Sequence, residues 1–398
     1  MGAERAQERT VHVPAGIRDA RSYSPELESL RGVACLLVFW FHASGTVDAG
    51  TRDVGPLRAF VYAGHTGVTL FFVLSAFFLS RPFLEQARGG PRVSWARFWA
   101  RRALRILPLY YCIVVVASIW NAGAPADLLR GLPYLVLLNS FPSLVEPLEP
   151  FSQLWWSLAT EWQFYLLLPI ASLCLLSRPG RVLGALVLCA YAVLYALFAL
   201  HRFGPRDPIA YTDLGFSLFG RAPALLAGVA AAWIWGRYAG SIRAALHRRK
   251  WLRRGGADAL LLALLWGLGE LLSGVTRRGF IAAEGTWHAW HVAEALFWGA
   301  LVLWILLAPL RTRPLFSNPA LRGVGVLSYS LYLVHLAILY RILIPYLGIM
   351  VDGKPGWTLR AFAGTLAALA ASLAVSFVSY RLVERPFLVR KARLGADR

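Results

Sequence analysis

The chain has 398 residues, of which 58% are hydrophobic, and its mean hydropathy is +0.54. These values exclude an ordinary soluble protein, and 16 tryptophans suit the interfacial aromatic belts of a polytopic membrane protein. The formal net charge of +20 would also fit a nucleic-acid-binding protein, so the distribution of the basic residues has to decide between these classes.

Apolar segments of about 20 residues predict ten transmembrane helices and an all-α polytopic fold. In chain order they cover residues 31–48, 64–80, 105–121, 154–176, 182–201, 214–236, 257–276, 288–310, 324–348 and 358–383. We expect a polar N-terminal tail at 1–25, a membrane domain at 26–388 and a basic C-terminal tail at 389–398.

The basic residues are divided unevenly between the connections. Taking every second connection from the N-terminus gives 27 lysines and arginines, whereas the other connections hold 8. This asymmetry is the positive-inside signature and predicts a multi-pass plasma-membrane protein with both termini in the cytoplasm. The basicity therefore reflects topology and contact with membrane lipid, and we expect no nucleic-acid partner.

The first span carries two ionisable side chains, Arg31 and His42, in an otherwise apolar run. Eleven residues are close to three helical turns, so both side chains share one face, ~16 Å apart along the axis. Ionisable groups are costly in lipid, so we expect both to face a polar interior.

Three later spans carry further buried ionisable groups. Glu161 and Arg221 each lie about seven residues inside the outer end of their spans, at a depth of ~10 Å that matches His42. His335 falls near the predicted midplane of the ninth span. We expect these side chains to pair around a hydrated cavity. The alternative is a polar network with a purely structural role.

A second polar layer is predicted at the cytoplasmic surface. Arg102 and Arg105 are spaced i, i+3 and can present two guanidiniums to one anion, as phosphate recognition requires. Glu28, Arg31 and Glu384 map to the same level. The alternative is that these arginines are a snorkelling, positive-inside anchor.

His288, His291 and Glu294 have a spacing of three that superficially suggests a metal site. On a helix the outer two of these side chains diverge by about 120°, so the trio cannot hold one tetrahedral ion. We therefore expect no metal, and an outer vestibule or interfacial polarity instead. Cys35 lies on the face of Arg31 and His42, where core packing is favoured over a role as nucleophile.

Six sequence blocks in order resemble the membrane acyltransferase family 3, which consists of bacterial O-acyltransferases with ten membrane helices. The blocks are 30–34 with His42, 67–77, 102–108, 156–165, 328–335 and 384–387. The similarity spans essentially the whole chain.

The resemblance implies that Arg31 and His42 are required for acyl transfer. It associates Arg102 and Arg105 with the donor, typically acyl-CoA and most often acetyl-CoA. Further family positions are matched by five other residues, whose roles it leaves open: Glu161, Tyr165, Arg221, His335 and Glu384.

The expected function is transfer of an acyl group, acetyl in the first instance, from acyl-CoA to a hydroxyl of a carbohydrate or glycosylated metabolite. His42 would act as general base, oriented by Glu161 or Glu28. Candidates for stabilising the oxyanion are Arg221, Tyr165 and Tyr332. A covalent acyl-enzyme through His42, Ser75 or Cys35 is the weaker route. The alternative function is an ion-coupled transporter, which also places ionisable groups inside a helix bundle.

Overall fold

The computed structural model describes residues 24–48, 53–279, 285–347 and 356–396. Within these ranges every regular element is helical. The α-helices are α1 (Pro25–Val47), α2 (Pro56–Tyr62), α3 (Thr66–Gln86), α4 (Trp95–Asn121), α5 (Leu132–Leu135), α6 (Trp156–Ser172), α7 (Arg178–Ala199), α8 (Pro208–Phe216), α9 (Leu218–Arg248), α10 (Ala257–Arg278), α11 (Gly285–Leu307), α12 (Arg313–Phe316), α13 (Pro319–Ile338), α14 (Ile344–Leu347), α16 (Leu359–Ser379) and α17 (Arg385–Ala396).

Shorter turns of helix connect or extend these elements. They are η2 (Pro125–Gly131), η3 (Leu138–Ser140), η4 (Pro142–Leu144), η5 (Ser152–Leu154), η6 (Leu173–Leu175), η7 (Leu252–Gly256), η8 (Leu339–Leu343) and η9 (Tyr380–Glu384). The last two widen the turn of a continuing helix, which changes the direction in which their side chains point.

The described chain contains ten helical segments that are long and apolar enough to span a membrane, as predicted. Several are longer than their apolar cores. The third starts at Trp95 instead of residue 105, and the sixth runs from Pro208 to Arg248 instead of 214–236. The helices continue past the hydropathy boundary because arginine is a good helix former, although it is poorly soluble in lipid.

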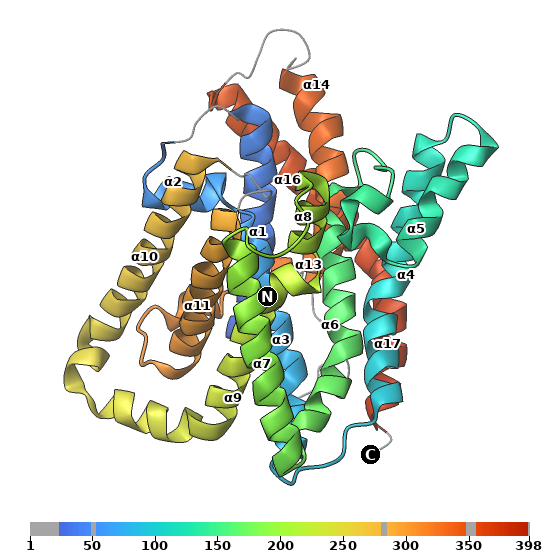
Figure 1. The fold of residues 1–398 in the computed structure, drawn as a ribbon. Helices are drawn as coiled ribbons and strands as arrows, with labels where there is room; N and C mark the ends of the chain where they lie inside the picture. The colour runs from blue at the N-terminus through green and yellow to red at the C-terminus, as the bar shows by residue number, and fades with distance from the viewer. Residues whose placement is uncertain (1–23, 49–52, 280–284, 348–355, 397–398) are drawn as a thin grey trace, which may run out of the picture.

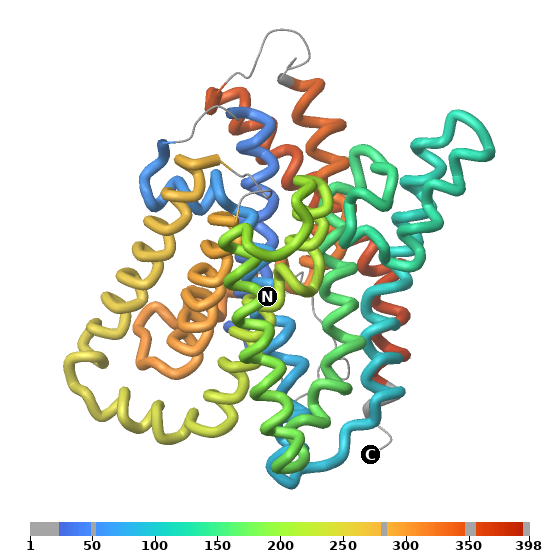
Figure 2. Tube along the Cα trace, in the orientation of Figure 1, coloured from blue at the N-terminus to red at the C-terminus, as the bar shows by residue number. Residues whose placement is uncertain are grey.

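The core of the bundle is built on α1, which packs against α13 and α3 (Figure 1). Glycines permit these close approaches. A Cβ on Gly325 of α13 would collide with the Glu28 carbonyl, and one on Gly67 of α3 would collide with that of Ala34. Segments from opposite ends of the chain therefore lie side by side, as the blue and orange-red tubes in Figure 2 show.

Helix ends are fixed by local signals. The side chain of Ser94 accepts a hydrogen bond from the backbone N–H of Arg97 at the start of α4, and Asn318 caps α13 in the same way through Ala320. Pro25 and Pro319 stand in the first turns of α1 and α13, where a missing N–H has no cost. These starts place Arg31 and the α13 residues Ser328–His335 at the centre of the bundle.

The C-terminal segment does not separate from the bundle at residue 389, where the sequence predicts a tail. Helix α17 continues through this position to Ala396 and packs along α4. This packing brings a C-terminal lysine, Lys391, to the arginines of α4.

Candidate active site

A pocket lies between α1, α3, α6 and α13, with an empty volume of about 430 Å³ that includes space open to solvent. Four predicted site residues line it: Arg31, Ser75, Glu161 and Tyr332. The other lining residues are Val68, Phe71, Phe72, Ser157, Leu158, Ser328 and Tyr329. The cavity is thus polar on its α1, α6 and α13 sides and aromatic on its α3 side.

Arg31 enters the pocket from α1. Its Nη2 lies 3.5 Å from the hydroxyl oxygen of Ser328, and its guanidinium lies 5.8 Å from the ring centre of Phe71. Glu161 and Tyr165 of α6 are close enough to interact with its charge. Arg31 and Glu161, predicted from separate spans, therefore meet at one site.

Arg31 belongs to a group of cations that we call the basic cluster. Its members are Arg31, Arg101, Arg102, Arg105 and Lys391. The side chain of Lys391 interacts electrostatically with all four arginines. Within the described part of the chain, the buried Nε of Arg102 has no hydrogen-bond acceptor. Like charges are unfavourable together where they are half-buried, so the basic cluster suits a polyanionic ligand.

Arg105 is held by a buried carboxylate. Its Nη1 lies 2.9 Å from Oε2 of Glu384, which is buried and also accepts a hydrogen bond from Ser330. The guanidinium lies 5.7 Å from the ring centre of Tyr329, which lines the pocket. The widened turn η9 directs Glu384 into the bundle at this point. Arg105 therefore connects the basic cluster to the pocket, whereas Arg102 keeps more of its hydrogen-bonding capacity for a ligand.

His42 lies further along α1 and faces a second histidine. Its Nδ1 is 2.7 Å from the Val38 carbonyl oxygen and 3.4 Å from Nε2 of His335, whose own Nδ1 is 2.9 Å from the Leu331 carbonyl oxygen. A carbonyl oxygen only accepts hydrogen bonds, so both Nδ1 atoms carry hydrogen. Nε2 of His42 is then the nitrogen that can take a proton.

His42 does not line the pocket, whereas Tyr332 of α13 does. The Tyr332 hydroxyl donates to the Leu154 carbonyl over 2.9 Å and lies 2.7 Å from the hydroxyl of Ser157, which ties α13 to α6. The ring of Tyr332 lies 6.1 Å from that of His335, which contacts His42. The chain of contacts from the pocket to His42 therefore runs through Tyr332 and His335.

Two predicted partners of His42 lie elsewhere. Glu28 is paired with Arg322, with Oε2 of the carboxylate 3.6 Å from the guanidinium Nε. Glu161 lines the pocket with Arg31. Among the residues the structure describes, the side chain that hydrogen bonds to His42 is His335, so neither carboxylate orients the imidazole here.

Arg221 is buried in an aromatic enclosure and does not line the pocket with Glu161. Its guanidinium lies 4.6, 4.9 and 5.3 Å from the ring centres of Trp287, Trp156 and Phe216. Aromatic faces stabilise a desolvated guanidinium, which explains how this charge is tolerated inside the bundle.

The three polar residues of α11 divide as the helix geometry predicts. His288 points away from Glu294 and packs on Phe198, with ring centres 4.7 Å apart. His291 Nδ1 lies 2.7 Å from Oε2 of Glu294. A residue that the spacing did not suggest, His65, completes a different trio with these two.

The family of the chain follows from its comparison with known proteins. The acyltransferase 3 family, described as an acyltransferase domain, matches residues 24–381. The chain belongs to the acyltransferase 3 family. This membership confirms the resemblance carried by the six sequence blocks, and it favours an enzyme over the alternative of a transporter.

Curated relatives in the acyltransferase 3 family align over nearly the whole chain. The peptidoglycan O-acetyltransferase OatA of Listeria monocytogenes is 25% identical over 393 residues, 93% of this chain and 56% of its own length. The putative peptidoglycan O-acetyltransferase YrhL of Bacillus subtilis is 25% identical over 397 residues, 92% and 55% respectively.

A third relative is closer in length. The putative membrane-bound transacylase BcsY of Komagataeibacter xylinus is 28% identical over 384 residues, 90% of this chain and 82% of its own. The chain therefore spans a little over half of the first two relatives and most of BcsY. No solved structure matches the chain.

Four residues of this acyltransferase are not indicated by the sequence. Lys391 falls in the predicted basic tail, and no spacing there links it to the arginines of α4. His65 lies at the start of the predicted span 64–80, and no local pattern links it to α11. Ser157 and Ser328, which line the pocket, carry no signal beyond the blocks that contain them.

Proposed function

We propose that this acyltransferase is an integral-membrane O-acyltransferase that moves an acyl group, acetyl in the first instance, from acyl-CoA to a hydroxyl of a carbohydrate or glycosylated metabolite. The observation that carries the proposal is that α1 bears Arg31, at the basic cluster and pocket, and His42, at the histidine pair. One rigid helix thus connects an anion site to a base.

The donor would bind at the basic cluster. Coenzyme A carries a diphosphate and a ribose phosphate, and Arg102, Arg105 and Lys391 offer several cationic donors to these oxygens. The pantetheine arm would enter the pocket beside Arg31. The ~16 Å rise of α1 from Arg31 to His42 is a reach that such an arm can cover. Tyr332 would have to move aside for the thioester to meet His42.

His42 would act as the general base. Its Nε2 takes the proton of the acceptor hydroxyl while the hydroxyl oxygen attacks the thioester carbonyl carbon. The tetrahedral intermediate collapses as the carbon–sulfur bond breaks, and the leaving thiolate receives the proton from His42. His335 acts as a positioning residue, because its Nε2 lies beside the Nδ1 hydrogen that His42 donates to the Val38 carbonyl and is a second, weaker acceptor for it.

Oxyanion stabilisation has to come from groups beside His42, because the oxyanion forms on the carbon that the acceptor hydroxyl attacks. Arg31 lies ~16 Å from His42 along α1 and is too far away for this role. Of the predicted candidates, Tyr332 is a neighbour of His335, but its hydroxyl hydrogen is given to the Leu154 carbonyl. We therefore propose Arg31 as a donor-binding residue and assign the oxyanion to none of the predicted candidates.

The proposed acceptor follows from the relatives. Two of them are named as peptidoglycan O-acetyltransferases, one of these putatively. A cell-envelope sugar is therefore the first acceptor to test, and a glycosylated small metabolite is the second. We propose that the basic cluster faces the cytoplasm, as the distribution of Lys and Arg predicts. The cytoplasm is also the compartment that supplies acyl-CoA.

The proposal is tested by reconstituting purified protein in lipid nanodiscs with acetyl-CoA labelled on the acetyl group. We expect donor binding and transfer of label to a saccharide acceptor in wild type. Arg102→Ala should weaken binding, whereas Arg249→Ala, which removes an exposed arginine of α9's end, should not. Absence of acetyl-CoA binding and turnover in wild type, with solute flux in vesicles, would refute the proposal.

A further inference from the structure

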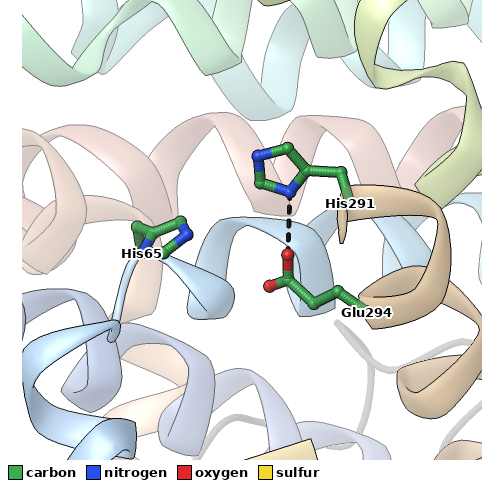
Figure 3. Close-up of side chains that lie close together, drawn as sticks. All are labelled: His65, His291 and Glu294. Atoms are coloured by element: carbon green, nitrogen blue, oxygen red, sulfur yellow. Dashed lines mark hydrogen bonds and ion pairs between the residues drawn. The ribbon is translucent and has the colours of Figure 1, made fainter. Parts of the chain in front are cut away.

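Three potential metal ligands meet at a place that the proposed acyl transfer does not use. His65 directly precedes α3, whereas His291 and Glu294 lie one turn apart on α11 (Figure 3). One ligand atom from each residue lies within 4.8 Å of the other two. The chain brings them together across 226 residues, which no local spacing predicts.

The burial of two members of this trio leaves a charge to be balanced. His291 and Glu294 are 5% and 3% exposed, whereas His65 is half-buried. One oxygen of Glu294, Oε2, is bonded to His291, whereas Oε1 is buried and has no hydrogen-bond partner in the described ranges. A buried carboxylate with an unsatisfied oxygen is costly, and a bound cation would remove that cost.

We propose that His65, His291 and Glu294 bind one divalent first-row transition-metal ion, with Zn²⁺ as the best match. Two imidazoles and one carboxylate are ligands that zinc accepts at three positions, leaving the fourth to water. The His291 nitrogen that binds zinc must carry no hydrogen, so any hydrogen on it moves to the other ring nitrogen or leaves as a proton.

One cation near the proposed metal site, Arg221, opposes the binding of a metal ion. Arg221 interacts electrostatically with Glu294 and stacks on Trp287, whose ring centre lies 4.3 Å from that of His291. The guanidinium competes with a metal for the same carboxylate. Zinc binding here therefore means that the two imidazole ligands outweigh the repulsion from Arg221.

The metal would join the start of α3 to α11 beside the end of α1 that carries His42. The ring of Phe41 lies 5.5 Å from that of His65, so the site is one side chain away from α1. This role is separate from acyl transfer, and its test depends on metal content instead of activity.

The test uses full-length protein purified without a histidine tag, stripped with EDTA and dialysed against Zn²⁺. We expect inductively coupled plasma mass spectrometry to find about one zinc ion per chain in the wild-type protein. The variants His65→Ala, His291→Ala and Glu294→Gln should each lose most of it, with affinity down by more than about tenfold. The matched control is His288→Ala, a buried histidine of the same helix that lies outside the trio.

A second measurement protects against variants that fold poorly. Zn²⁺ should raise the Tm of wild type and His288→Ala, and should leave the Tm of Glu294→Gln unchanged. The proposal is overturned if stripped wild type takes up no zinc and shows no Tm shift, or if the three variants retain as much zinc as wild type.

Discussion

Nδ1 of His42 on α1 lies 3.4 Å from Nε2 of His335 on α13, although 293 residues separate them in the chain. Each ring also holds a main-chain carbonyl through Nδ1, so both rings are fixed in orientation. His335 thus takes the place that a carboxylate often has behind a catalytic histidine.

Replacing His335 should lower catalysis more than donor binding. We expect His335→Ala to reduce kcat by about 10- to 100-fold, because the imidazolium of His42 keeps the Val38 carbonyl but loses the second acceptor and the ring that fix its orientation. The Kd for acetyl-CoA should stay within about threefold of wild type. His335→Gln, whose amide oxygen can accept the same hydrogen, should recover part of the loss. Equal losses in the Ala and Gln variants would contradict the positioning role.

Alanine substitutions of Arg102 and Arg105 should weaken donor binding alike but differ in their effect on stability. Both variants should bind acetyl-CoA about tenfold or more weakly, since each removes charge-assisted hydrogen bonds to phosphate. Arg105→Ala should also lose about 3–5 kcal/mol of stability, because it strands the buried carboxylate of Glu384. Titration calorimetry and thermal unfolding separate the two effects. A Tm for Arg102→Ala as low as that of Arg105→Ala would contradict this division.

Lys391 should contribute to donor binding even though it lies near the C-terminus. We expect Lys391→Ala to weaken acetyl-CoA binding by about tenfold and to reduce the dependence of Kd on salt. Arg390→Ala is the control, because this neighbouring arginine is exposed and stacks on Phe387. Identical Kd values for the two variants would remove Lys391 from the donor site.

Tyr332 should stabilise the bundle without acting on the reacting atoms. Its hydroxyl hydrogen is committed to the Leu154 carbonyl, so Tyr332→Phe should cost about 1–2 kcal/mol of stability and change kcat by less than about threefold. Thermal unfolding and steady-state kinetics check this pair of results. A kcat loss of about 100-fold or more with an unchanged Tm would instead identify Tyr332 as an oxyanion donor.

The sequence predicts the membrane architecture well, because hydropathy records directly what lipid demands of a helix. It predicts His42, Glu161 and Arg221 as neighbours through shared depth, whereas the structure places Glu161 at the pocket with Arg31 and Tyr332. Arg221 points into its aromatic enclosure instead. Depth fixes the height of a residue in the bundle, whereas the rotation of its helix decides which neighbours it meets.

Pairs of residues from distant segments were beyond sequence reasoning. The contacts of Arg105 with Glu384 and of Glu28 with Arg322 depend on which helices become neighbours. His65 meets His291 for the same reason. Similarly, hydropathy starts the third span at residue 105, although the helix begins at Trp95. It therefore cannot predict how α17 packs along the basic turns between these two positions.

We propose that His42 supplies the base for acyl transfer while the basic cluster separately binds the donor. Acetyl-CoA binding and single-turnover acetyl transfer should be measured for His42→Ala beside wild type. We expect donor binding within about threefold of wild type and a loss of transfer of at least about 100-fold. Transfer at the wild-type rate by His42→Ala, with donor bound normally, would show that His42 is not the base.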